Sequence, residues 1–75
     1  MVDIDKALII ASDLFVAHFG PVIAEKLMLL IIGHTEETEQ EFTIVYKWAD
    51  NKREFCRVPV DKRTGAAVLF HLAIA

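Results

Sequence analysis

The chain has 75 residues, a net charge of −3 and a hydrophobic fraction of 55%, which is high for a soluble domain. The length allows a single domain over residues 1–75. The longest apolar run, Leu27 to Ile32, is too short to span a membrane. The excess of acidic residues disfavours nucleic-acid binding. One cysteine cannot form an intramolecular disulfide, so we expect self-association to help stabilise so small a core.

The N-terminal residues and the lone thiol indicate where the protein works. Asp3 and Asp5 stand where a secretory signal peptide would carry positive charge. An unpaired cysteine agrees with a reducing compartment. We therefore expect a cytoplasmic protein.

The first predicted element is an amphipathic helix that begins at Ile4, is capped by Asp3 and ends at Gly20-Pro21. Ile9 and Val16 form a second, smaller apolar flank, which is a candidate contact with another chain. At 100° per residue the other apolar positions share one stripe, made of Ile4, Ala7, Leu8, Ala11, Leu14, Phe15, His18 and Phe19.

Residues 22–33 allow two interpretations. Pro21 and Gly33 would bracket a second helix, and the residues between them include good helix formers. A helix that is apolar on every side needs burial all round, however, which a small domain can hardly provide. We therefore predict a strand from about Lys26 to Thr35.

The remaining chain predicts three more strands separated by turns. Phe42 to Trp48 alternates large apolar side chains with smaller or polar ones, the pattern of a strand with one buried face. The expected class is α+β, with one N-terminal helix packed on a four-stranded antiparallel meander. The predicted strands are Glu41–Ala49, Phe55–Val60 and Ala66–Ile74, and the turns are 36–40, 50–53 and 61–65.

Five-residue turns would place the even-numbered side chains on the core face. The expected cross-strand pairs are Trp48 with Glu54, Tyr46 with Cys56, Ile44 with Val58 and Val60 with Ala66. Pro59 is a difficulty, because a proline in an inner strand loses a ladder bond. The expected core face holds Phe42, Ile44, Tyr46, Trp48, Cys56, Val58, Val60, Val68, Phe70 and Leu72, and extends to Met28, Leu30 and Ile32.

The odd-numbered face is the basis of the predicted homodimer. It mixes polar side chains (Thr43, Lys47, Arg57, His71) with apolar ones, whereas a solvent-facing sheet surface should be polar. We expect a second copy to cover this face or an edge. The predicted interface residues are Leu29, Ile31, Val45, Phe55 and Leu69, beside Leu27.

The sequence carries no catalytic, cofactor or metal signature, so we expect a protein that is not an enzyme and needs no cofactor. His18 is expected in the core, His34 at the surface and His71 on the odd face, too far apart to meet. Cys56 should pack in the core as a small apolar group. The acidic side chains of residues 36–41 are expected to be exposed to solvent, close to the positive charges of Lys62 and Arg63.

An alternative is a small-ligand or catalytic pocket that forms only between subunits. Its lining would include two aromatic side chains and two that can carry positive charge, namely Tyr46, Trp48, Arg57 and His71. Stabilisation by small molecules would distinguish this protein from one that binds a single macromolecule.

Residues 58–65, Val-Pro-Val-Asp-Lys-Arg-Thr-Gly, resemble the terminal hairpin of helix-then-sheet modules such as PepSY-like domains. A helix ending in Phe-Gly, an aromatic-rich strand and Val-Asp-Lys-x-Thr-Gly together resemble several small bacterial immunity-protein families. Such modules commonly bind or inhibit another protein. The resemblance implies a non-enzymatic binding role of the immunity-protein or inhibitor type.

Overall fold

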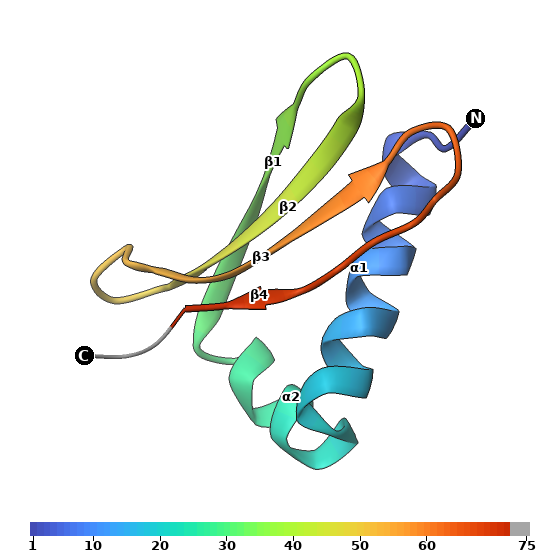
Figure 1. Ribbon diagram of the computed structural model, residues 1–75. Helices are drawn as coiled ribbons and strands as arrows, with labels where there is room; N and C mark the ends of the chain where they lie inside the picture. The colour runs from blue at the N-terminus through green and yellow to red at the C-terminus, as the bar shows by residue number, and fades with distance from the viewer. Residues whose placement is uncertain (73–75) are drawn as a thin grey trace.

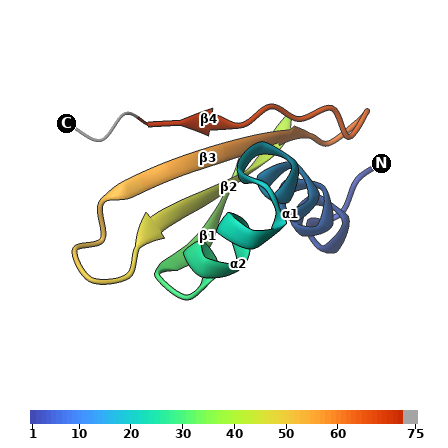
Figure 2. The ribbon, with the colours of Figure 1, turned by 90° about the horizontal axis from the view of Figure 1, so that it is seen from below.

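The computed structural model describes residues 1–72, so the end of the predicted last strand at Ile74 lies outside the described chain. The elements in order are α1 (Ile4–Phe19), α2 (Pro21–Met28), β1 (Ile31–Glu37), β2 (Glu41–Trp48), β3 (Glu54–Asp61) and β4 (Phe70–His71). The strands form one antiparallel sheet in the order β1-β2-β3-β4. Both helices lie on the same face of the sheet (Figures 1 and 2). The predicted α+β class and meander are confirmed.

Helix α1 has the predicted limits, and Asp3 caps it by accepting a hydrogen bond from the Lys6 amide at 2.8 Å. Its buried stripe is narrower than predicted. Ala7, Ala11 and Phe15 are fully buried, and the two alanines let the helix backbone approach the sheet closely. The predicted core positions Ile4 and Leu8 are instead substantially exposed, because α1 contacts β2 and β3 without covering β1.

Residues 21–28 form a helix, which corrects the start of the strand predicted from Lys26 to Thr35, since β1 begins at Ile31 and includes only the second half of that range. Gly20, with φ of 86° and ψ of 151°, separates two helices bent by 119°. The objection to a helix was wrong because it assumed burial all round, whereas only Ala24 of α2 is buried and Val22 and Ile23 face outward. Within the described chain, neither helix alone is long and apolar enough to cross a membrane.

The pairing of β2 with β3 follows the predicted register until a bulge interrupts it. Tyr46 pairs with Cys56 and Ile44 pairs with Val58, as predicted. The register then shifts, so that Lys47, not Trp48, lies opposite Glu54. The extra residue is Phe55, which the bulge turns into the core against Phe15, Phe19 and Trp48.

The outer strands present the opposite faces from those predicted. Val60 lies opposite Ala67 instead of Ala66, and this one-residue difference reverses every side chain of the last strand. Leu69 therefore packs toward the helices, while Val68, Phe70 and Leu72 are exposed. On β1 the buried residue is likewise odd-numbered, Ile31.

Pro59 fits the inner strand because of the direction of its missing amide. The Asp61 amide donates to the Ala66 carbonyl, and the Phe55 carbonyl accepts from Leu72, so the odd-numbered residues of β3 direct their backbone polar groups toward β4. Pro59 therefore lacks a donor only on the β4 side, between the Val60–Ala67 bridge and β4 itself. The ladder with β2 continues past it, with Thr43 opposite.

Candidate functional site

The sheet face without helices is here called the open face. Its central apolar side chain, Val45, is already buried in the single chain. Val45 of β2 lies between His34 of β1 and Arg57 of β3 in the register. Its exposed fraction is 0%, although it is not part of the core packed by the helices. Of the apolar residues predicted for this face only Val45 lies on it, and its neighbours on β2 and β3 are Thr43, Lys47, Arg57 and Pro59.

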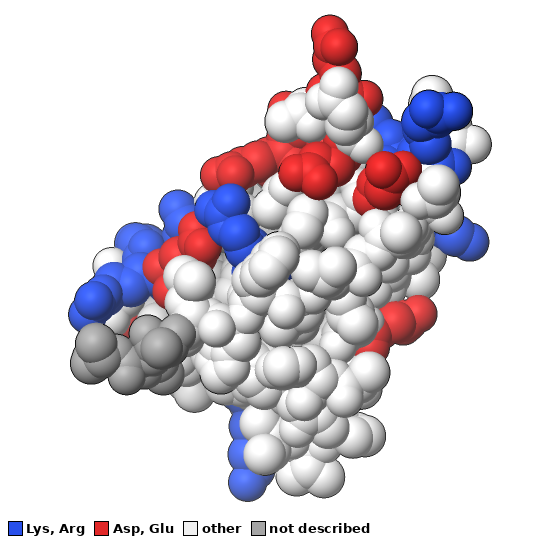
Figure 3. Space-filling view, in the orientation of Figure 1, with Lys and Arg blue, Asp and Glu red and all other residues white. Residues whose placement is uncertain are grey.

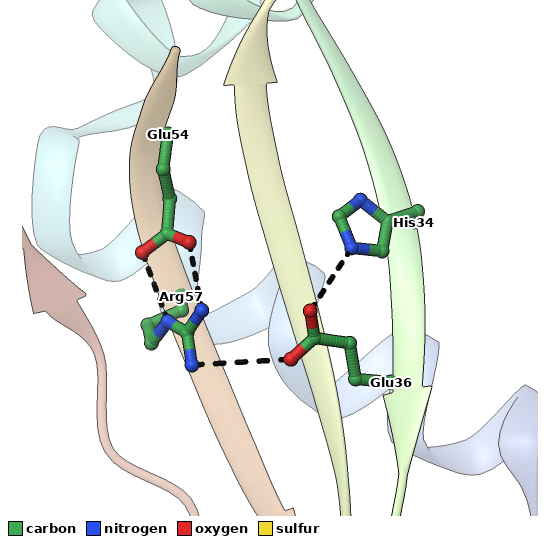
Figure 4. A network of polar contacts seen from close by, with 4 residues as sticks. All are labelled: His34, Glu36, Glu54 and Arg57. Carbon is green, nitrogen blue, oxygen red and sulfur yellow. Dashed lines mark hydrogen bonds and ion pairs between the residues drawn. The ribbon is translucent and has the colours of Figure 1, made fainter. Parts of the chain in front are cut away.

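A polar network spans the open face across three strands (Figure 4). The Arg57 guanidinium donates to both oxygens of Glu54 at 2.7 and 2.9 Å, and its Nη1 lies 3.9 Å from Glu36. The second Glu36 oxygen lies 3.3 Å from Nε2 of His34. The hydrogen bond from Arg57 holds the pKa of the Glu54 carboxyl below its usual value, and the same bond raises the pKa of Arg57. The network is internally satisfied and fixes these side chains over Val45.

The Glu54–Arg57 pair predicts a pH-dependent contribution to stability. Because the pKa of Glu54 is lower in the folded state than the 4.5 of a free glutamate, the contribution is present above about pH 4.5 and is lost as the pH falls through the folded-state value. We expect Glu54→Gln to lower the free energy of unfolding by less than about 1 kcal/mol at pH 7, since the pair is partly exposed, and by a smaller amount at pH 3. Urea unfolding at both pH values measures this, and an equal loss at both would contradict it.

The structure does not bring the four predicted ligand-binding residues together. Tyr46, Trp48 and His71 lie on the helix side of the sheet, and Arg57 lies on the open face. The Tyr46 ring packs on Phe15, and burial raises the pKa of its hydroxyl to about 12. Trp48 and His71 each contact Phe55 but do not share a pocket with Arg57.

Two of the three histidines meet, which corrects the expectation that none would. The rings of His18 and His71 have centroids 5.8 Å apart, and both pack against Phe19. His18 is exposed instead of lying in the core, because it belongs to the last turn of α1. His34 is exposed, as predicted. The reversed register of the last strand brings His71 to the helix side, and the sequence alone held no signal for it.

The predicted interface residues are dispersed. Ile31 and Phe55 belong to the core, Leu69 packs against it, and Val45 lies under the polar network. Leu29, in the turn before β1, is 84% exposed. Leu29 and Leu30 line an apolar pocket of about 470 Å³ with Trp48, Ala49, Asp50 and Asn51.

Part of the apolar surface that the fold leaves uncovered lies at β4, an edge of the sheet (Figure 2). Val68, Phe70 and Leu72 are each 40–52% exposed. Residues 64–72 contain no charged side chain and no proline, which are the usual protections of an exposed edge. The opposite edge, β1, has His34, Glu36 and Glu37 exposed. In Figure 3 the surface over β4 and the lower part of α1 is uncharged, with Lys, Arg, Asp and Glu around its margin.

Cys56 is fully buried, as predicted, and should be unreactive. Burial, followed by the nearby Glu54 charge, raises the pKa of its thiol to about 12, so almost no thiolate forms at neutral pH. We expect a thiol reagent at pH 8 to label Cys56 only after unfolding, at a rate that follows urea concentration. Rapid stoichiometric labelling of the native protein would contradict this placement.

The acidic run pairs with the neighbouring loop, as predicted. Lys62 donates to Glu37 at 2.6 Å, and its Nζ lies 4.7 Å from the centroid of the Phe42 ring. The Lys62 backbone also accepts from Val2 and donates to Gln40, which ties the N-terminus to two loops.

In comparisons with known proteins, no family model, no curated protein and no solved structure matches this chain.

Proposed function

We propose that this chain is a non-enzymatic protein-binding module that works as a homo-oligomer and acts as an immunity protein or inhibitor. The observation that carries the proposal is the apolar, unprotected edge of the sheet at β4. Exposed strand edges with apolar side chains are templates for pairing with another chain, and natural monomers generally block them. The resemblance of residues 58–65 to the hairpin of PepSY-like modules, and of the order of helix, aromatic-rich strand and turn to small immunity proteins, supports the type of role.

The small size of the domain supports the homo-oligomer. The described chain leaves fourteen large hydrophobic side chains substantially exposed, at the N-terminus, on both helices, in the turn before β1, on β1, and in or beside β4. A 75-residue domain buries only about 60% of the surface of its unfolded chain, so association adds burial that the fold cannot provide alone. A face between copies would use part of this surface, and another face would remain for a different protein.

Sedimentation velocity between about 1 and 100 μM tests the self-association, because apolar interfaces of small homodimers commonly give micromolar or tighter dissociation constants. We expect the mass to rise above the 8.5 kDa of one chain as the concentration increases. A mass of one chain throughout would contradict the proposal.

A second candidate function is supported by the pocket at Trp48. Its volume of about 470 Å³ and its lining by Leu29 and Leu30 suit a small apolar ligand, with Asp50 and Asn51 as polar groups at the margin. This revises the predicted subunit pocket, since of its four residues only Trp48 lines this one. We expect a ligand to quench Trp48 fluorescence and raise the unfolding temperature, and Leu30→Asp to abolish both effects.

A further inference from the structure

We propose that two copies of this chain pair antiparallel through their β4 edges, centred on Leu69, and that Asp13 of each copy lies against the His18–His71 pair of the other. This inference deepens the proposed self-association and rests on it. The occupant of the edge is a second copy, because the chain carries both halves of the complementary surface.

The backbone supplies the first argument. The Ala66 carbonyl accepts a hydrogen bond from β3, and the Leu72 amide donates one to β3. The even-numbered residues of this segment therefore direct their backbone polar groups toward β3. Since backbone polar groups alternate along a strand, those of Ala67, Leu69 and His71 point outward, where the described chain has no further strand. A pairing centred on Leu69 sets Ala67 opposite His71 of the second copy and uses all three outward-facing residues at once.

The side chains of the open face supply the second argument. In this register Phe70 of one copy lies beside Val68 of the other, and the two-fold axis repeats the pair. Both side chains are about half exposed in the single chain, at 52% and 50%. Aromatic and β-branched residues form favourable cross-strand pairs, and no charge in residues 64–72 opposes the contact.

Hydrogen-bonding complementarity between a carboxylate and imidazoles on the helix side supplies the third argument. Asp13 borders a groove of about 360 Å³ between α1 and the start of the β4 segment, lined by Ile10, Leu14, Ala17, Gly65 and Ala67. His18 and His71 lie at the other end of the segment. Antiparallel pairing brings the Ala67 level of one copy to the His71 level of the other, so a carboxylate meets two imidazoles at each end. Within residues 1–72 the Asp13 carboxylate makes no hydrogen bond or ion pair.

Two substitutions of equal chemistry on opposite edges test the location. Phe70→Lys places a charge at the centre of the proposed contact, and we expect it to raise the dissociation constant of the dimer at least about tenfold. Ile32→Lys, on the β1 edge and 44% exposed, is the matched control and should leave it unchanged. If Phe70→Lys fails to fold, as judged by circular dichroism, Val68→Lys replaces it.

A charge exchange tests the register. We expect Asp13→Lys alone and His18→Glu alone to weaken self-association. In the first variant the lysine faces two histidines and gains no attraction, and in the second the glutamate faces Asp13, a like charge, at both ends. An equimolar mixture should recover the wild-type mass in sedimentation, since the introduced lysine then faces the introduced glutamate and the unchanged Asp13 faces the unchanged His18. Failure of the mixture to recover would overturn the inference.

The two proposals fail in distinguishable ways. If the wild-type chain is a monomer at all concentrations, self-association is wrong and the edge pairing with it. If the wild type associates but Phe70→Lys and Val68→Lys, both folded, associate equally well, self-association stands and the β4 pairing is wrong.

Discussion

Replacing Phe15 by alanine is expected to remove a large share of the free energy of unfolding. Phe15 is fully buried, and its ring packs on Phe19, Tyr46 and Phe55, so it joins α1 to β2 and β3. Truncating a buried phenylalanine costs about 3–5 kcal/mol. At about 0.05–0.15 kcal/mol per residue, a 75-residue domain has only about 4–11 kcal/mol of stability in total.

Urea unfolding followed by Trp48 fluorescence measures this loss. The control is Leu8→Ala on the same helix, where the side chain is 42% exposed and truncation should cost less than about 1 kcal/mol. Both residues belong to the stripe predicted from the sequence, so the pair of variants tests which part of the stripe faces the sheet. Equal losses at the two positions would contradict the placement of α1.

Replacing Gly20 by alanine is the second large expected effect. The backbone of Gly20, at φ 86° and ψ 151°, adopts a conformation that is almost confined to glycine. No atom lies within 4 Å of where a β-carbon would stand, so the cost is backbone strain, without a steric clash. We expect a loss of about 1–3 kcal/mol, because the bend at Gly20 brings α2 back against β1.

Gly33→Ala is the matched control for this substitution. A β-carbon at Gly33 would make ordinary contacts of 3.6 Å or more with Tyr46 and the Val45 carbonyl, and its φ is not positive. The free energy of unfolding should change by less than about 1 kcal/mol. A loss at Gly20 no greater than that at Gly33 would show that the bend does not depend on glycine.

The parts of the fold that the sequence predicted correctly depend on local signals. Asp3 and the Gly20-Pro21 pair mark both ends of α1, and the alternation from Phe42 to Trp48 identifies β2 as the central strand. The pairs Tyr46–Cys56 and Ile44–Val58 follow from the turn between them. Each of these features is decided within a few residues of chain.

The errors arose where one residue decides the side of the sheet. The bulge at Phe55 and the longer connection after Asp61 each shift the register by one, which moves side chains across the sheet. The sequence pattern does not distinguish these cases, because both faces of the last strand are apolar in residues 66–72. The predicted pocket of Tyr46, Trp48, Arg57 and His71 depended on that register and therefore divides between two faces.

The candidate site was only partly visible in the sequence. The absence of charge from Thr64 to Leu72 could be read directly and marks the edge that lacks protective charges. The network of His34, Glu36, Glu54 and Arg57 could not, because it joins strands whose facing depends on the bulge. The proximity of His18 to His71 likewise needed the three-dimensional register.

Hydrogen exchange of the Leu69 and His71 backbone amides tests the central claim most directly. These N–H groups point away from β3, so they are protected only if another strand covers the β4 edge. We predict slow exchange at high protein concentration, faster exchange on dilution, and loss of protection in Phe70→Lys. Fast exchange of both amides under conditions where the protein is associated would contradict pairing through β4.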